Sequence, residues 1–123
     1  MAATLNIFLA ILLLSITNGA YGESGGVSYI HVSQARTGRS VEGQPEYEVT
    51  VSNKYFCAQS NVLVNCFGLN SVKPVDPRVI KPVDAKRCSI NEGKPIPALS
   101  QVKFTYAWKT PQDFPVVSAL EFC

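Results

Sequence analysis

Four cysteines are the residues whose type and number point most directly to chemistry: Cys57, Cys66, Cys88 and Cys123. An even number of cysteines in a small exported chain favours two disulfide bonds. A metal site is disfavoured, because no two of the four have the C-x2–4-C spacing of zinc ligands and the chain has a single histidine. We therefore predict two disulfide bonds, no metal site and no other cofactor.

The strands around the four cysteines reduce the number of possible disulfide pairings. Four half-cystines allow three pairings. If the strand before Cys57 and the strand that ends at Cys66 form a hairpin, these two cysteines are separated by several strand residues at about 3.3 Å each. Disulfide α-carbons lie within about 7 Å of each other, so a Cys57–Cys66 bond is disfavoured. Of the two remaining pairings we favour Cys57–Cys88 with Cys66–Cys123.

The other reactive side chains form no catalytic pattern. His31 is the sole histidine, and it is accompanied neither by a G-x-S-x-G motif nor by a reactive free cysteine. A glycosidase needs two facing carboxylates, and no spacing singles out a pair among the loop acids Asp76, Asp84, Glu92 and Asp113. The chain also lacks a glycine-rich phosphate loop. We therefore predict that the protein is not an enzyme.

Residues 1–22 have the features of a secretory signal peptide. Ile7 to Ile16 is an apolar run that is too short for a membrane-spanning helix, which needs roughly 20 residues. Small residues favour cleavage after Gly22, with cleavage after Ala20 as the alternative. No second apolar stretch of spanning length follows. We expect residues 23–123 to form a single secreted domain without a membrane anchor.

The elements that must position the cysteines are strands. Val102, Phe104, Tyr106 and Trp108 alternate with more polar residues, which is the period of a strand with one apolar face. Gly38 to Pro45 is expected to be a loop, because it holds glycines and a proline. The other candidate strands are short and are separated by turn residues: 27–33, 46–52, 62–67, 78–81, 88–90 and the run after residue 113. This pattern predicts a small antiparallel β-sandwich stapled by two disulfides.

The charge of the chain is too mild to indicate a polyanionic partner. The formal net charge is +2, which argues against nucleic acid or a membrane surface as the ligand. The basic residues nevertheless concentrate between residues 73 and 94. They predict a docking patch for an acidic protein partner, with a solvated loop face as the alternative: Lys73, Arg78, Lys81, Lys86 and Arg87.

Tyr106 and Trp108 share the apolar strand face with Phe104, and three interpretations of these aromatic residues remain open. They are core residues, or an exposed platform on which sugar rings stack, or an anchor for a protein partner. The same alternation serves all three interpretations.

A set of sequence strings, in order along the chain, gives a family resemblance. They are V-S-Q-A-R-T-G-R at 32–39, G-Q-P-E-Y-E-V at 43–49, V-L-V-N-C-F-G at 62–68, V-D-P-R at 75–78, C-S-I-N-E-G-K-P at 88–95, V-K-F-T-Y-A-W at 102–108 and the cysteine at 123. Together they resemble the plant tapetum-determinant-like family of small secreted cysteine-rich proteins. The resemblance covers nearly the whole chain after the signal peptide.

The resemblance implies a secreted signalling ligand of the apoplast. The founding member of the family specifies tapetal cell fate in anther development by binding the ectodomain of a leucine-rich-repeat receptor kinase. The chain departs from the family pattern in one respect, because a further cysteine is expected four residues before Cys57, where this sequence has Asn53, and another near the mature N-terminus. The four cysteines carry over, whereas no receptor-contact residue does.

Two other functions remain as alternatives. One is a cell-wall carbohydrate-binding module that uses Tyr106 and Trp108. The other is an inhibitor of an extracellular hydrolase that presents the proline-braced loop from Val72 to Pro82.

Overall fold

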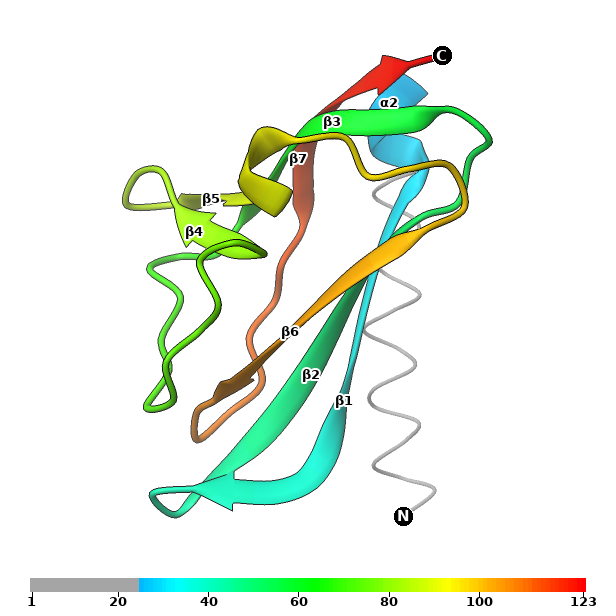
Figure 1. Ribbon diagram of the computed structural model, residues 1–123. Helices are drawn as coiled ribbons and strands as arrows, with labels where there is room; N and C mark the ends of the chain where they lie inside the picture. The colour runs from blue at the N-terminus through cyan, green and yellow to red at the C-terminus, as the bar shows by residue number, and fades with distance from the viewer. Residues whose placement is uncertain (1–24) are drawn as a thin grey trace.

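The computed structural model describes residues 25–123, which form two antiparallel sheets (Figure 1). The strand order is β1-β2-β6 in one sheet and β4-β5-β3-β7 in the other. The elements are α2 Gly25–Ser28, β1 Ile30–Val41, β2 Gln44–Asn53, β3 Ala58–Asn65, β4 Ile80–Pro82, β5 Arg87–Ile90, the 3-10 turn η1 Asn91–Gly93, β6 Gln101–Ala107 and β7 Val116–Phe122. The predicted all-β fold is confirmed, and the predicted signal peptide lies outside the described residues.

The β1–β2 hairpin corrects the expected loop at residues 38–45. Val41 pairs with Gln44, so only Glu42 and Gly43 form the turn, and both have positive φ, 50° and 78°. That is the geometry of a type I′ turn, whose twist matches that of antiparallel strands. Before the turn the register shifts between Arg36 and Ser40, so that residues 37–39 bulge opposite Glu46 on β2.

The core lies between the two sheets and is built from the alternating positions of their strands. Phe104 and Tyr106 of β6 are buried, as the alternation predicts. They pack edge-on against Phe114, with ring centroids 5.5 and 5.7 Å away. The rest of this buried cluster comes from both sheets and includes Tyr47, Val49, Val51, Val62, Val64, Ile80, Ile90 and Ile96.

The disulfides are Cys57–Cys123 and Cys66–Cys88, with α-carbons 4.7 and 5.8 Å apart. The favoured pairing of Cys57 with Cys88 and Cys66 with Cys123 is therefore wrong. The observed pairing follows from the strand order, because β5 and β7 pair with opposite edges of β3. Val64 opposite Cys88 brings that cysteine to Cys66, and Ala58 opposite Phe122 brings Cys123 to Cys57.

A buried carboxylate, Glu46, ties the long β3–β4 loop to the first sheet. Its side chain is 2% exposed and accepts hydrogen bonds from Thr37 Oγ1 (2.7 Å), Arg39 Nε (2.9 Å) and Lys73 Nζ. Lys73 belongs to the β3–β4 loop, and its ammonium also donates to Thr105 Oγ1 on β6 (2.6 Å). Hydrogen bonds from Lys73 and Thr37 lower the pKa of Glu46 from 4.5 to about 2, although burial alone would raise it.

Removing the bond at Cys123 tests whether it anchors β7. We expect Cys57→Ser with Cys123→Ser to lower the free energy of unfolding by about 2–4 kcal/mol, because the bond closes a long loop of the unfolded chain. Urea denaturation followed by circular dichroism measures the change. An unchanged denaturation midpoint would show that β7 is held by packing alone.

Neutralising Glu46 tests the loop attachment. We expect Glu46→Gln to lower the free energy of unfolding at pH 7 by about 1–3 kcal/mol, because the carboxylate charge is lost and an NH2 group that cannot accept replaces one acceptor oxygen. Since the folded-state pKa of Glu46 is depressed, its contribution is complete above about pH 5 and is lost as pH falls toward 2. The difference between wild type and variant should therefore shrink as acid is added.

The matched control for that comparison is Glu48→Gln. Glu48 is exposed on the same strand and lies 3.9 Å from Lys103 Nζ, so we expect a change within about 0.5 kcal/mol. Equal effects of the two variants at pH 7 would contradict the role assigned to Glu46.

Candidate protein-interaction surfaces

The basic residues predicted to form one docking patch divide into two places. Arg78, Lys81, Lys86 and Arg87 lie on or beside the β4–β5 hairpin. Lys73 lies apart from them, over β2 and β6, where it binds Glu46 and Thr105. Its side chain is 30% exposed. Lys73 therefore serves the fold, and the patch is limited to residues 78–87, which we name the basic hairpin.

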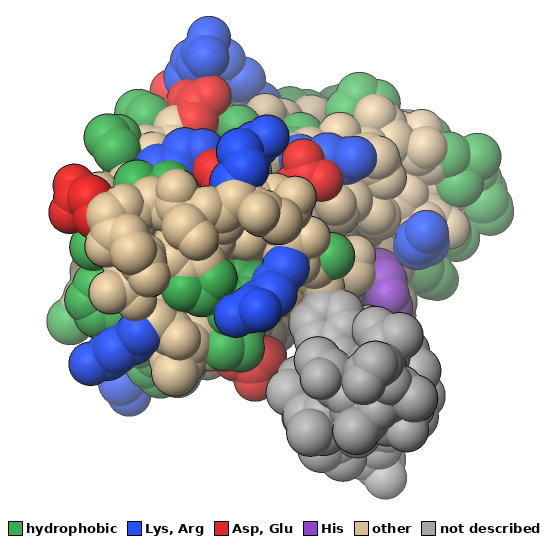
Figure 2. Space-filling view, turned by 90° about the horizontal axis from the view of Figure 1, so that it is seen from below, with side chains coloured by type: hydrophobic (Ala, Val, Ile, Leu, Met, Phe, Trp, Pro, Cys, Tyr) green, Lys and Arg blue, Asp and Glu red, His purple; other side chains and the backbone are tan. Residues whose placement is uncertain are grey.

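Two of the four cations on the basic hairpin have carboxylate partners. Arg78 binds Asp76 (3.1 Å), and Arg87 binds Asp84 (2.7 Å). The Arg87 guanidinium and the backbone N–H groups of Arg87 and Lys86 lower the pKa of Asp84 to about 2. The Arg78 guanidinium likewise lowers the pKa of Asp76. These arginines are therefore largely neutralised, and Figure 2 shows basic and acidic side chains interspersed on the surface.

Lys81 and Lys86 are the cations of the basic hairpin that remain available to a partner. Within residues 25–123 neither has a carboxylate oxygen within 4.0 Å, and both are exposed. The Lys86 carbonyl accepts hydrogen bonds from the backbone N–H groups of Cys66 (2.7 Å) and Phe67 (3.0 Å). Together with the Cys66–Cys88 bond, these contacts hold the hairpin in a fixed place on the domain.

The predicted sugar platform of Tyr106 and Trp108 is not formed. Tyr106 is fully buried; its hydroxyl donates to Gln34 Oε1 (2.6 Å) and accepts from the Gln112 N–H (2.8 Å). Burial raises the pKa of Tyr106 to about 12. Trp108 is half-buried against the core, with the Lys109 ammonium 5.9 Å from its ring centroid. A stacking surface that needs both rings is therefore excluded.

The loop proposed for a hydrolase inhibitor is attached to the first sheet at its beginning. The Val72 N–H donates to the Ala107 carbonyl (2.9 Å), and the Ala107 N–H donates to Ser71 Oγ (3.0 Å). Lys73 adds its bonds to Glu46 and Thr105. The first part of Val72–Pro82 therefore lies along β6 and is not presented as a free inhibitory loop.

An apolar surface at the Cys57–Cys123 bond was not predicted. Phe56 and Phe122 are 72% and 67% exposed, and Leu99 is 73% exposed. In Figure 2 hydrophobic side chains gather at the right-hand end, where Figure 1 places the β2–β3 loop. The repeated dipeptide Phe-Cys at 56–57 and 122–123 is the sequence signal for this surface. It becomes informative only when these two cysteines are known to be bonded to each other.

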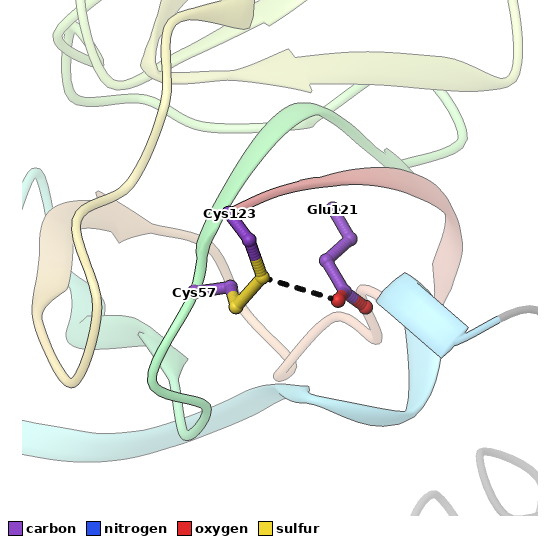
Figure 3. Close-up of side chains that lie close together, drawn as sticks. All are labelled: Cys57, Glu121 and Cys123. Atoms are coloured by element: carbon purple, nitrogen blue, oxygen red, sulfur yellow. Dashed lines mark hydrogen bonds between the residues drawn. A yellow bond between two sulfur atoms is a disulfide. The ribbon is translucent and has the colours of Figure 1, made fainter.

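The disulfide at this surface rules out a metal site there. Cys57, Glu121 and Cys123 come close together, and a Glu121 oxygen lies 3.5 Å from Cys123 Sγ (Figure 3). The sulfur atoms of Cys57 and Cys123 are bonded to each other, so neither offers the thiolate that a metal ion requires. His31 lies on β1 opposite Ser52 and belongs to no group of three potential metal ligands among residues 25–123.

Comparisons with known proteins agree on one family. The family model described as "Tapetum determinant 1, C-terminal" matches residues 26–123. "TPD1 protein homolog 1A" of Oryza sativa subsp. japonica is 33% identical over 89 residues, which cover 66% of this chain and 39% of the relative. "TPD1 protein homolog 1" of Arabidopsis thaliana is 32% identical over 76 residues, covering 60% and 42%.

The chain thus aligns with about two fifths of the length of these curated relatives. No solved structure shows significant similarity to it. In residues 25–123 there is no helix long and apolar enough to cross a membrane. Because the family model spans all of the folded region from residue 26 onward, the chain belongs to the Tapetum determinant 1 family.

Proposed function

We propose that the protein is a secreted signalling ligand that binds the ectodomain of a leucine-rich-repeat receptor kinase in the apoplast. It would act in plant reproductive development and cell-fate specification. The observation that carries the proposal is the family match over residues 26–123, since the resemblance implies ligands of this kind. The proposal also includes cleavage of residues 1–22 before secretion.

The disulfides support an extracellular location. Both bonds join segments that are far apart in the chain, with sequence separations of 66 and 22 residues. Such bonds persist in oxidising compartments and are rare in the cytosol. They also fix the loops of a small domain, so that less conformational entropy is lost when a partner binds.

The basic hairpin is the proposed site of electrostatic attraction to the receptor. Lys81 and Lys86 are its unpaired cations, and Phe67 and Val83 are exposed beside them. Opposite charges across the rim of an interface accelerate encounter more than they strengthen the final complex. An acidic area on the receptor ectodomain would therefore attract this end of the ligand.

Binding to a panel of immobilised leucine-rich-repeat ectodomains tests the function. We expect the refolded, disulfide-intact domain to bind at least one member. For that member Lys86→Glu should lower the association rate constant roughly threefold to tenfold at low salt, with little change in dissociation. Surface plasmon resonance at two salt concentrations measures both rates.

Lys109→Glu is the control, because Lys109 is also an exposed lysine and lies outside the basic hairpin. It should leave the association rate close to that of wild type. Equal effects of the two charge reversals would contradict the role of the basic hairpin. Absence of binding to every ectodomain would refute the proposed function.

A further inference from the structure

One disulfide brings two exposed phenylalanines to the same end of the domain. Phe56 precedes Cys57, Phe122 precedes Cys123, and the two cysteine α-carbons are 4.7 Å apart. Because successive α-carbons are 3.8 Å apart, the two phenylalanine α-carbons lie within about 12 Å of each other. Their exposed fractions, 72% and 67%, show that neither ring is covered by the rest of the domain.

Other aromatic and apolar side chains adjoin this pair. The Phe56 ring lies 4.3 Å from the Tyr55 ring, which stacks on Tyr29 at 3.7 Å. The Leu99 N–H donates to the Tyr55 carbonyl (3.0 Å). Leu120 and Phe122 share one side of β7, because they are two residues apart on a strand. We name this surface the aromatic end: Tyr29, Tyr55, Phe56, Leu99, Leu120 and Phe122.

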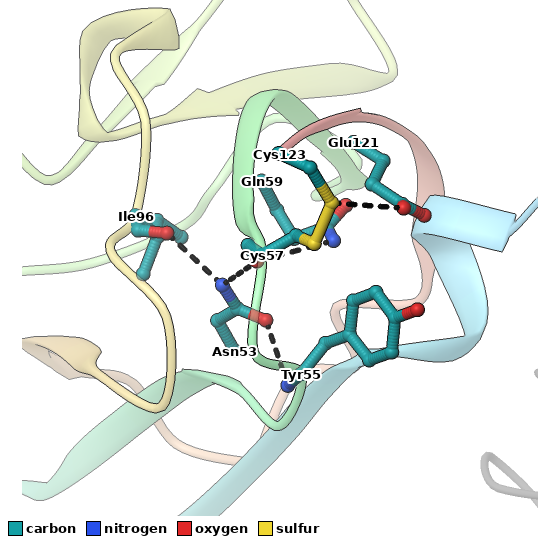
Figure 4. The surroundings of a disulfide bond; sticks show 7 residues. All are labelled: Asn53, Tyr55, Cys57, Gln59, Ile96, Glu121 and Cys123. Atoms are coloured by element: carbon teal, nitrogen blue, oxygen red, sulfur yellow. Dashed lines mark hydrogen bonds between the residues drawn. A yellow bond between two sulfur atoms is a disulfide. The ribbon is translucent and has the colours of Figure 1, made fainter.

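The backbone beneath the aromatic end is held rigidly by Asn53 (Figure 4). Its buried amide donates to the carbonyls of Cys57 (2.9 Å) and Ile96 (3.0 Å) and accepts from the Tyr55 N–H (3.0 Å). The exposed rings are therefore attached to a preformed frame. Little ordering of the backbone remains to oppose binding, which is the condition under which aromatic anchors contribute most.

The area of the aromatic end fits one side of an ordinary protein complex. At roughly 200 Å² for a whole phenylalanine, the two rings expose about 280 Å², and Leu99 and Leu120 extend this surface. A standard interface buries about 800 Å² per partner, a little over half of it non-polar. An obligate dimer would need more than about 1,000 Å² per copy, so a different protein is the better occupant than a second copy.

The charges at the aromatic end balance. Lys54 and Glu121 flank the two phenylalanines, and both are exposed. The charges of these two side chains cancel, so together they give no attraction for anionic lipid headgroups. The apolar side chains of the aromatic end themselves carry no charge, so they are complementary to an apolar hollow.

We propose that the aromatic end is the contact that retains the ligand on its receptor, by inserting Phe56 and Phe122 into a neutral, apolar hollow of the ectodomain. The inference rests on the proposed function and deepens it. Figure 1 shows the β4–β5 hairpin and the β2–β3 loop on opposite sides of the domain. The basic hairpin thus governs the rate of encounter, and the aromatic end governs the lifetime of the complex.

The test is Phe56→Ser with Phe122→Ser, which leaves both disulfides intact. For an ectodomain that binds the wild-type domain, we expect dissociation to become at least about 30-fold faster, the effect of losing a binding hot spot. The association rate constant should stay within about twofold. Val117→Ser is the control, because it removes an exposed apolar side chain from the same strand outside the aromatic end. An unchanged urea midpoint confirms that the double variant is folded.

Each result of this experiment is decisive. If the wild type and the double variant dissociate from an ectodomain at equal rates, the role of the aromatic end is refuted and the proposed function stands. Failure of every ectodomain to bind the wild type refutes the function and, with it, this inference. A wild-type dimer in sedimentation that the double variant abolishes, or binding to neutral phosphatidylcholine vesicles, would assign the surface to another occupant and overturn the proposal.

Discussion

The bond from Cys123 to Cys57 ties the end of β7 to the beginning of β3. Strand β7 is at the edge of its sheet and pairs only with β3, and none of its side chains is fully buried. Apolar burial alone therefore contributes little to holding it, since stabilisation scales with the area removed from water. The covalent bond fixes β7 at its end, and it brings Phe122 to the same end of the domain as Phe56. The attachment of the end of β7 and the position of Phe122 at the aromatic end therefore depend on this link.

Buried polar side chains join segments of the chain through hydrogen bonds, in addition to the packing of the small apolar core. Glu46 attaches the β3–β4 loop to the first sheet. Tyr106 joins β1 to the β6–β7 link through its hydrogen bonds with Gln34 and Gln112. Asn53 connects the β2–β3 loop to the segment after η1. Each satisfies its buried groups by binding segments distant in the chain, as buried polar groups must. Asn53 stands where the family resemblance expects a further cysteine, and its amide supplies several non-covalent links at that place.

The features of the fold that depend on local sequence pattern could be predicted from the sequence. The alternation around Phe104 and Tyr106 identified β6 and its buried face, because a strand has a period of two. The sequence pattern does not predict the β1–β2 hairpin, because glycine and proline between residues 38 and 45 indicate a loop, although Glu42-Gly43 suits a two-residue turn. The disulfide pairing depends on strand order, which no local pattern reveals. The role of Lys73 depends on the Glu46 carboxylate, which lies 27 residues away in sequence. The partners of Arg78 and Arg87 were nearby acids, and they leave Lys81 and Lys86 as the available cations of the predicted patch.

Disulfide mapping of the unreduced protein shows whether Cys123 is bonded to Cys57. The domain is digested without reduction, and the linked peptides are identified by mass spectrometry before and after reduction. We predict one linked pair that joins the peptide containing Phe56-Cys57 to the peptide containing Phe122-Cys123, and a second pair that joins Cys66 to Cys88. A linkage of Cys66 to Cys123 would contradict it, because β7 would then be anchored at the other end of β3 and the two phenylalanines would be separated.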